Sequence, residues 1–348
     1  MKKIYIDNSI TRQYSITGVA KFIFTLNKAI LLNKISTEIF GWTYPMFLFR
    51  YKYILYIIWL NTVFYIKSFF TKSSIYIYPG FIRPYLLHKK HQYYPVIHDL
   101  TAYRDNEMSL HGKFISKLAL SIAIRKATTI ITVSKTIKNE LIEKFNISPE
   151  KIKIIYNSIG SQFANFKENK EILNKYEIET HNYILSVATL NKRKNIPELI
   201  KAFEQISEKY PDLKLVLVGG MGNEQREKLT KHSNVIFTGY IKDEELPTLY
   251  SNALLYMYPS LYEGFGIPLI EAQYCGCPVL CSDIPVFREI GANSVEYCKP
   301  EKSGIVQGLN NLINNKEKLD ELTILGFNNV KRFSIDNIAQ QVKEVING

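Results

Sequence analysis

The stretch YPSLYEGFGIPLIEAQYCGCPVLCSD, residues 258–283, decides the fold of this 348-residue chain. A strand ends at Pro259, a glycine-containing loop follows, and Pro268 stands where the first helical turn tolerates a residue without an N–H. Gly276 ends that short helix, and PVLCSD begins another strand. In an open parallel sheet, the N-terminus of such a helix presents free N–H groups and a positive dipole end to a ligand. We therefore expect this loop to bind an anionic ligand.

Two acids accompany the loop: Glu263 lies in it, and Glu271 follows eight residues later in the helix. Gly264 and Gly266 lie between them and let backbone N–H groups approach a ligand without a side chain in the way. One carboxylate would accept hydroxyl hydrogen bonds at the loop, and the other about one helical turn deeper. This arrangement suits a polyol attached to a phosphate. The alternative is a surface glutamate beside a capped helix.

Strand-like runs alternate with helical patterns along the whole chain. The runs occupy residues 3–7, 73–80, 93–99, 128–135, 151–159, 183–189, 213–220, 234–240, 253–260 and 278–283. Such alternation predicts parallel sheets covered by helices on both faces. A polar segment without strand signal, residues 160–182, separates two series of strands. We therefore predict an α/β protein with two doubly wound, Rossmann-like domains, 1–165 and 166–330, followed by a C-terminal helix within 331–348.

Composition and charge narrow the class of protein. The chain has 46% hydrophobic and 22% charged residues, which excludes disordered and fibrous classes. Its net charge of +12 is uneven: residues 1–170 carry 25 basic and 9 acidic side chains (+16), and residues 171–348 carry 19 and 23 (−4). The first half is therefore expected to meet phosphates or an anionic membrane surface. No helix-turn-helix, RNP or zinc-finger pattern supports nucleic acid as the partner.

The most apolar stretch runs from Tyr53 to Ile66 and counts 14 residues, fewer than the ~20 that a membrane-spanning helix needs. Two alternatives stay open for it: a buried core helix, or a helix lying in the lipid headgroup region. The N-terminus reaches Asp7 before any apolar run of signal-peptide length, so we expect a cytoplasmic protein.

Metal and redox sites are not expected. The four cysteines, at positions 275, 277, 281 and 298, lie in apolar surroundings, and their spacing matches no common zinc pattern. Small buried thiols in a reducing compartment are the simpler interpretation. His88 and His91 have a ligand-like spacing but lie in a basic run, which disfavours a metal site.

The pair Glu263 and Glu271, followed by A-x3-G-x-P-V, resembles the signature of the retaining nucleotide-sugar glycosyltransferases of family 4. The resemblance continues in the segments TLNKRKNIPELIKAF, LVGG and FTGYIKDEELPTLYSNA and covers most of residues 183–300. It implies the GT-B architecture, in which two Rossmann-like domains face each other across a cleft. It also implies a nucleotide-diphosphate sugar in the second domain, an acceptor in the first, and a C-terminal helix that packs back on the first domain.

The resemblance assigns roles to the residues of the loop and helix. Glu263 would lie by the donor sugar, and the backbone N–H groups of Phe265 and Gly266 would lie near sugar and phosphate. Gly264 would belong to the same donor-binding loop. Glu271 would contact the nucleotide ribose.

A basic pair is implied to hold the donor diphosphate, and Arg193 and Lys194 match it. Their charge would stabilise the leaving nucleoside diphosphate without a divalent metal. The alternative is a solvated helix start. Many relatives have an arginine where this chain has Thr189, which leaves open whether Arg193 replaces it. Gly219 and Tyr240, in LVGG and FTGY, are also expected at the donor.

The first domain has three candidate residues. Gly18, in TGVAKF, is similar to the family's glycine-bearing turn and would let the backbone approach the diphosphate. His98 and Asp99, in VIHDL, are similar to a pair in enzymes that add mannose and related sugars to bacterial surface polysaccharides. Asp99 would orient His98, which would hydrogen-bond the sugar or the acceptor. The alternative is that Asp99 caps the next helix and His98 is packed.

These features predict a retaining glycosyltransferase of the hexosyltransferase type, with mannose or a similar sugar favoured. The acceptor would be a hydroxyl of a glycan or lipid-linked saccharide in the synthesis of lipopolysaccharide, capsule or a related polysaccharide. The resemblance implies front-face substitution without a covalent intermediate, no cofactor and no metal. A peripheral position on the cytoplasmic membrane face is expected. The alternatives are another GT-B enzyme, such as a nucleotide-sugar epimerase or a phosphorylase, or a non-catalytic basic binding protein.

Overall fold

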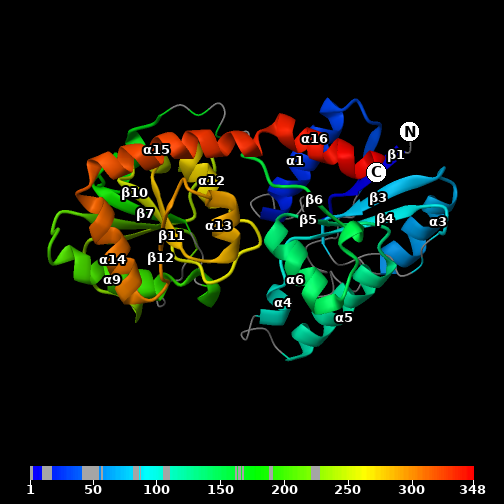
Figure 1. Ribbon diagram of the computed structural model, residues 1–348, viewed down its shortest axis with the longest axis horizontal. Helices are drawn as coiled ribbons and strands as arrows, with labels where there is room; N and C mark the ends of the chain where they lie inside the picture. Colours follow the sequence, from blue (N-terminus) through cyan, green and yellow to red (C-terminus); the bar gives the residue numbers. More distant parts are fainter. Residues whose placement is uncertain are drawn as a thin grey trace. The chain divides into compact units, whose positions relative to one another are not determined.

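The computed structural model describes residues 3–9, 18–40, 55, 58–80, 86, 88–104, 110–160, 163, 166, 168–187, 191–220 and 228–348. The chain forms two compact units: unit 1 consists of residues 1–158 together with 335–348, and unit 2 of residues 159–334. In each unit, helices pack against a parallel sheet (Figure 1). The predicted α/β class is thereby confirmed.

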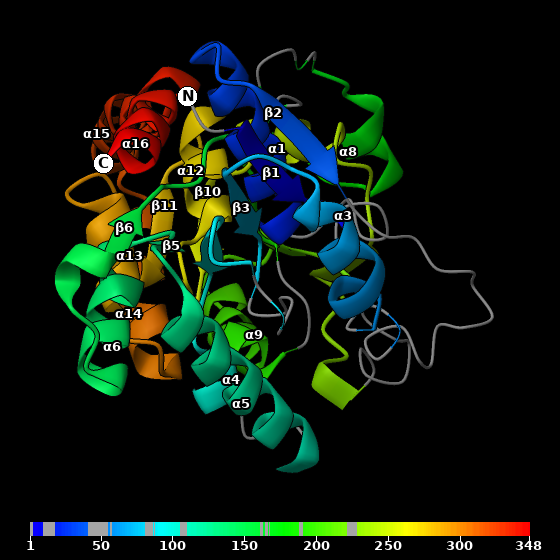
Figure 2. The same ribbon diagram turned by 90° about the vertical axis from the view of Figure 1, so that its right-hand side faces the viewer.

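Unit 1 has a six-stranded parallel sheet in the order β2-β1-β3-β4-β5-β6. Its strands are β1 (Lys3–Asp7), β2 (Thr37–Phe40), β3 (Ser74–Tyr78), β4 (Gln92–Ile97), β5 (Ile130–Thr132) and β6 (Ile152–Ile154). Its helices are α1 (Gly18–Leu32), the π-helical turn η2 (Leu60–Phe64), α3 (Tyr65–Phe69), α4 (Thr101–Arg104), α5 (Leu110–Lys126), α6 (Lys135–Phe145), the 3-10 turn η3 (Pro149–Lys151) and α16 (Ile335–Asn347). Figure 2 shows α3 and α6 on opposite sides of β3. The strand order reverses between β1 and β3, the kind of point where open sheets bind ligands.

The local sequence explains these elements. β3 reads SIYIY and is buried throughout, as a central strand of a parallel sheet must be. α6 begins at Ser134, whose Oγ accepts a hydrogen bond from the N–H of Ile137 at 3.2 Å. The same helix ends at Asn146, which adopts the left-handed conformation typical of a helix C-terminus.

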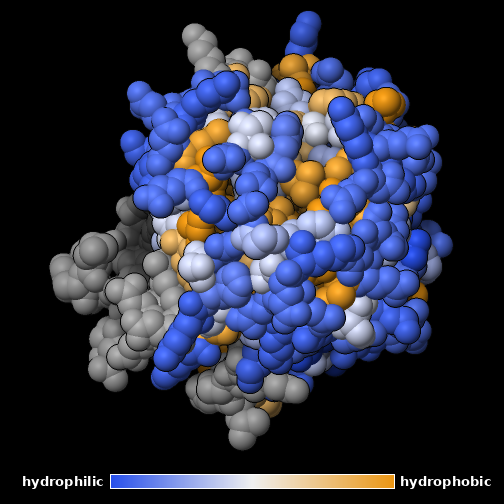
Figure 3. Space-filling model, turned by 90° about the vertical axis from the view of Figure 1, so that its left-hand side faces the viewer, coloured by the Kyte–Doolittle hydropathy of each residue, from blue (hydrophilic) through white to orange (hydrophobic). Residues whose placement is uncertain are grey.

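Unit 2 repeats the architecture with a second parallel sheet in the order β12-β11-β10-β7-β8-β9. Its strands are β7 (Tyr183–Val187), β8 (Lys214–Val218), β9 (Val235–Gly239), β10 (Leu255–Tyr258), β11 (Val279–Ser282) and β12 (Glu296–Cys298). Its helices are α8 (Glu171–Lys175), the 3-10 turn η4 (Lys192–Lys194), α9 (Ile196–Ser207), α11 (Leu246–Ser251), α12 (Ile267–Tyr274), α13 (Pro285–Gly291), α14 (Lys302–Ile313), α15 (Lys316–Val330) and the 3-10 turn η5 (Lys331–Phe333). The face of unit 2 in Figure 3 is hydrophilic over most of its described area.

One core cluster of unit 2 is formed by its sheet and the helices α9 and α14. Alternate residues of β8 and β10 point into it, including Leu215, Leu217, Leu255 and Met257. Helix α9 contributes a fully buried stripe that includes Phe203. The strand ends are therefore rigidly held, which fixes the loops that follow them.

The chain returns to unit 1 in its last helix, α16, which packs on α1. Ile338 and Val342 of α16 are buried. The side-chain amide of Asn33 donates to the backbone oxygen of Ala339 at 2.7 Å, and the N–H of Tyr156 donates to the side-chain oxygen of Gln341 at 2.9 Å. Two elements far apart in sequence thus close unit 1.

The segment from Tyr53 to Ile66 is described only in part. From Ile58 onward it forms helix, continuing through η2 to the end of α3. Leu60 and Phe64 are buried, whereas Ile58 and Ile66 are exposed, so this helix has one core face and one exposed apolar face. No helix in the described part of the chain is long and apolar enough to cross a membrane.

Candidate active site

The loop after β10 adopts a conformation that only its glycine allows. Gly266, the residue before α12, has φ of 98°, and a Cβ there would lie 2.9 Å from a ring carbon of Phe287. Both the left-handed backbone and the close ring therefore require glycine. α12 begins at Ile267 with Pro268 in its first turn, and Gly276 follows its end, as the sequence predicts.

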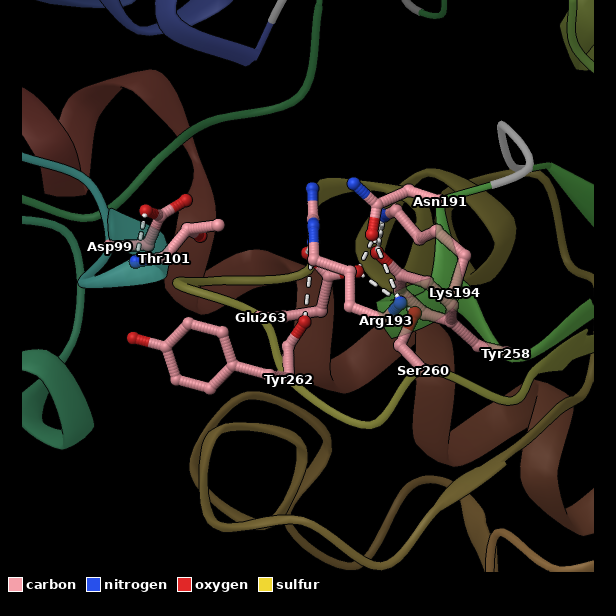
Figure 4. A network of polar contacts seen from close by, with 9 residues as sticks. All are labelled: Asp99, Thr101, Asn191, Arg193, Lys194, Tyr258, Ser260, Tyr262 and Glu263. Atoms are coloured by element: carbon pink, nitrogen blue, oxygen red, sulfur yellow. Dashed lines mark hydrogen bonds and ion pairs between the residues drawn. The ribbon is translucent and has the colours of Figure 1, made fainter. Parts of the chain in front are cut away.

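Glu263 is the centre of an ion cluster in which its own carboxylate is buried and Arg193 is partly exposed (Figure 4). One carboxylate oxygen accepts from Nη1 of Arg193 at 2.8 Å. The other accepts from Nζ of Lys194 at 2.5 Å and from Oγ of Ser260 at 2.9 Å. Arg193 Nη1 also donates to the backbone oxygen of Tyr262 at 3.2 Å. The structure thus brings together three of the predicted site residues.

Two loops that follow neighbouring strands build this ion cluster. Arg193 and Lys194 lie in η4, after β7, where the side-chain oxygen of Asn191 accepts from the N–H of Arg193 at 3.0 Å. The N–H of Leu261, in the loop after β10, donates to the backbone oxygen of Arg193 at 2.7 Å. Because β7 and β10 are paired in the sheet, both loops emerge at the same edge.

The electrostatics keep the cluster ionised. Burial by itself would raise the pKa of Glu263, but the charges of Lys194 and Arg193 outweigh burial, and the net pKa is lowered. Nζ of Lys194 also donates to the hydroxyl of Tyr258 at 3.4 Å. Burial, reinforced by the nearby Glu263, raises the pKa of Tyr258 far above its usual value, so this phenol stays protonated. Two cations and one carboxylate leave a net positive charge at the loop.

The sequence did not indicate Tyr258 and Ser260 as partners of the cluster. Both precede the pair Glu263 and Glu271, within five residues of Glu263. Their hydroxyl groups, at the end of a buried strand, were the sequence signal that could have indicated them. Phe265, expected near the donor through its N–H, has its side chain buried with its ring 5.5 Å from that of Phe333.

Glu271 is buried in α12. It lies close enough to Tyr250 and Cys275 for its charge to add to the burial that raises the pKa of both groups. Cys275 and its three fellow cysteines are free thiols.

Gly219 and Tyr240 come together at the ends of β8 and β9. The N–H of Gly219 donates to the backbone oxygen of Gly239 at 2.9 Å. The ring of Tyr240 lies against Gly220, the residue after Gly219, and a Cβ on Gly220 would be 2.3 Å from a ring carbon. Tyr240 itself is 74% exposed. The result is an exposed aromatic ring resting on a glycine turn. Thr189 lies outside the described residues.

In unit 1, His98 and Asp99 follow the end of β4. Oδ1 of Asp99 accepts from the N–H of Thr101 at 3.0 Å, which is the helix-capping alternative (Figure 4). The His98 ring meets Phe22 of α1 edge-on at 5.1 Å between centroids. Among the described residues, the buried Nε2 of His98 has no hydrogen-bond partner. Burial lowers the pKa of His98 to about 4, against the opposite effect of Asp99, so the ring is neutral at pH 7.

Gly18 is the first residue of α1, the helix that also carries Phe22. The start of α1 and the end of β4 therefore adjoin at the same edge of the unit 1 sheet. His88 and His91 lie elsewhere in unit 1, each with Nε2 near a backbone oxygen of α3, those of Tyr65 and Ser68. The described residues contain no cluster of three or more His, Cys, Asp or Glu side chains suited to a metal ion.

Comparison with known protein families gives two matches that together span most of the chain. The family described as "Glycosyl transferases group 1" matches residues 168–326, and "Glycosyltransferase Family 4" matches residues 73–162. The O-antigen chain mannosyltransferase RfbU of Salmonella typhimurium is 34% identical over 253 residues, 71% of this chain and 67% of that protein. The O-antigen chain mannosyltransferase B of Escherichia coli is 29% identical over 285 residues, 78% of this chain and 73% of that protein.

Solved structures support the fold. HepE of Anabaena, crystallised with UDP and glucose, superposes with a TM-score of 0.75 at 16% identity, covering all of both chains. WaaG, a glycosyltransferase involved in lipopolysaccharide biosynthesis, gives a TM-score of 0.74 at 15% identity, covering 99% of this chain and 100% of that one. At these identities the likeness concerns architecture, which is the two-domain GT-B fold.

Proposed function

This chain belongs to the family 4 glycosyltransferases, and from that premise we propose that it transfers a hexose, with mannose favoured, from a nucleoside diphosphate. The acceptor is a hydroxyl of a glycan or lipid-linked saccharide in the synthesis of a cell-surface polysaccharide. The names of the relatives from Salmonella typhimurium and Escherichia coli support mannose and O-antigen-type products. The anomeric configuration of the sugar is retained.

One observation carries the donor assignment: the ion cluster of Glu263, Arg193 and Lys194 beside the N-terminus of α12. Two cations held by one carboxylate leave positive charge for a diphosphate, and the N-terminus of the helix adds its positive dipole end. Charge that develops on the leaving diphosphate would be stabilised by groups that are already oriented. This arrangement supports a reaction in which no metal ion is needed.

The departing phosphate then helps to deprotonate the acceptor hydroxyl, and the acceptor attacks the same face of the sugar. Glu263 is already occupied by three donors, which fits a role in holding the cations and the sugar better than a role as a nucleophile. The basic first half of the chain receives the acceptor, and an anionic inner-membrane surface is the proposed partner of that half.

The purified chain, incubated with GDP-, UDP- and dTDP-sugars and a saccharide acceptor, tests the proposal. We expect release of one nucleoside diphosphate, activity in excess chelator, and a product whose anomeric proton shows retention by NMR. Lys194→Ala should reduce turnover by about 10²-fold. Lys201→Ala is the matched control, because Lys201 forms only a surface pair with Glu198. Interconversion of the donor without acceptor would instead indicate an epimerase, and activity restored only by a divalent metal would overturn the metal-free mechanism.

A further inference from the structure

One face of the helix that runs from Ile58 through η2 and α3 is apolar and exposed. Its members are Ile58, Val63, Ile66, Phe69 and the adjoining Phe70, which we call the α3 surface. Phe70 is 81% exposed and Ile66 60%. Val63, Ile66 and Phe69 follow one another at spacings of three, which makes them neighbours on the helix surface. Exposed apolar residues grouped in this way mark a site of interaction.

The opposite face of the same helix is anchored in the core. Leu60, Phe64 and Ser68, spaced four residues apart, are buried. The ring of Phe64 stacks on Phe40 at 4.8 Å and meets Tyr76 of β3 edge-on at 5.3 Å. The exposed side chains are therefore presented by a helix that is fixed to the sheet.

Three side chains from residues 88–91 contact backbone oxygens of α3. His88 Nε2 lies 3.1 Å from the backbone oxygen of Tyr65, and His91 Nε2 lies 3.0 Å from that of Ser68. Nζ of Lys90 donates to the backbone oxygen of Phe69 at 2.5 Å. Carbonyl groups at a helix end need such partners. His91 and Lys90 thus hold the last turn of this helix, which fixes the position of Phe69 and Phe70, and His88 contacts its first residue.

The exposed charged side chains on and next to this helix in the sequence are lysines. Lys67, Lys72, Lys89 and Lys90 are exposed on or beside it. The sequence contains no Asp or Glu between Glu38 and Asp99. A second copy of this chain placed against the same surface would set lysines against lysines, which disfavours a symmetric dimer. An anionic, partly apolar surface is complementary to it.

We propose that the α3 surface docks unit 1 onto a bilayer that contains anionic phospholipids. Ile66, Phe69 and Phe70 enter the headgroup and acyl boundary, and the surrounding lysines contact lipid phosphates. The helix lies along the interface rather than across it. This inference names the surface of unit 1 that would contact the proposed membrane partner. It rests on the proposed function only in one respect, which is the reason why the enzyme would meet a membrane.

Sedimentation of the full chain with vesicles tests the proposal. One set of vesicles contains equal parts of phosphatidylethanolamine and phosphatidylglycerol, and the other only phosphatidylcholine. We expect binding to the first set that weakens with added salt, because salt screens exposed charges. Ile66→Ser should weaken binding severalfold and Phe69→Ser with Phe70→Ser by about tenfold or more. Lys72→Glu and Lys89→Glu should each weaken it about fivefold or more.

Ile324→Ser is the matched control, because Ile324 is 63% exposed on helix α15 of unit 2. It should bind anionic vesicles as the wild type does. Equal binding of the wild type to both kinds of vesicle, or undiminished binding of the Phe69/Phe70 variant, would overturn the proposal. A concentration-dependent dimer in gel filtration that Phe70→Ser abolishes would also overturn it, because the surface would then be a contact between copies.

Two further measurements separate this inference from the proposed function. The Phe69/Phe70 variant should keep its near-ultraviolet circular dichroism and its nucleoside diphosphate release with a soluble acceptor. Glu263→Gln should bind anionic vesicles normally while losing transfer. If vesicle binding fails and transfer persists, the docking surface is wrong and the function stands. If transfer fails in the wild type but vesicle binding persists, the proposed function is wrong and the docking surface stands.

Discussion

Replacing Glu263 by Gln should lower the stability of unit 2 far more than the loss of one ordinary ion pair. The carboxylate holds Arg193, Lys194 and Ser260. The side chain of Glu263 is 9% exposed, that of Lys194 is 13%, and that of Arg193 is 31%. Removing one partner from a buried pair costs about 3–5 kcal/mol, because a charge is left without compensation.

Two features reduce this estimate. The partial exposure of Arg193 lets water screen its charge, and the glutamine carbonyl still accepts one hydrogen bond. We therefore expect Glu263→Gln to lower the free energy of unfolding of unit 2 by about 2–3 kcal/mol. Glu198→Gln serves as the control, because Glu198 pairs with Lys201 at the surface, where such pairs contribute at most about 1 kcal/mol.

The assay must report on unit 2 alone, since a two-unit chain need not unfold in one step. Both tryptophans, Trp42 and Trp59, belong to unit 1 by sequence. Tryptophan fluorescence in urea should therefore show an unchanged unit 1 transition. Hydrogen exchange by mass spectrometry on peptides that cover β10 and α12 should show the loss in unit 2.

The pH dependence gives a second test of the same argument. The pKa of Glu263 is lower in the folded protein than its ordinary value of 4.5. Its stabilisation is therefore fully present above pH 4.5 and is lost as the pH falls through the lowered folded pKa. The difference between wild type and Glu263→Gln should shrink in that acid range. A difference below about 0.5 kcal/mol at pH 7 would refute the reasoning that this cluster is a desolvated, mutually dependent unit.

Three further predictions concern other parts of the chain. Because the pKa of His98 falls to about 4 on folding, the unfolded chain binds a proton between pH 6.5 and 4 that the folded chain does not. As the pH falls through this range, the free energy of unfolding of unit 1 should decrease by up to about 1.4 kcal/mol per pH unit, measured by tryptophan fluorescence in urea. The decrease should be smaller in His98→Leu, and equal slopes would contradict this. Glu271→Ala should weaken nucleoside diphosphate binding by about 1.5–3 kcal/mol in calorimetry, and unchanged affinity would exclude a ribose contact. Gly266→Ala should destabilise unit 2 by about 2 kcal/mol, because the backbone is left-handed and Phe287 blocks the new methyl group; normal hydrogen exchange in α12 would contradict this.

Sequence patterns located most strands because buried parallel strands are short apolar runs bounded by polar loops. They did not locate β2 and β12, which read TEIF and EYC. These strands lie at the outer ends of their sheets and are too short for a periodic signal. α12 was predictable almost to the residue, because Pro268 and Gly276 act through local backbone geometry.

The histidines of unit 1 mark the limit of local reasoning. His88 and His91 have a spacing that metal ligands also use, yet both side chains contact backbone oxygens of α3. The sequence left open whether Asp99 orients His98 or caps the next helix, and the hydrogen bond to the N–H of Thr101 is the capping contact. A side chain's partner depends on the element that packs beside it, which spacing alone does not encode.

The sequence by itself determined the fold class, the loop that precedes α12 and the chemical character of its acids and cations, because these depend on local conformation and residue type. Only the tertiary structure joined Glu263 to Arg193 and Lys194, which are about 70 positions away. Those groups meet because β7 and β10 pair in the sheet, so that two distant loops emerge at one edge. Folding also divided the helix from Ile58 to Phe69 into a core face and an exposed face, since burial is a property of what surrounds a residue.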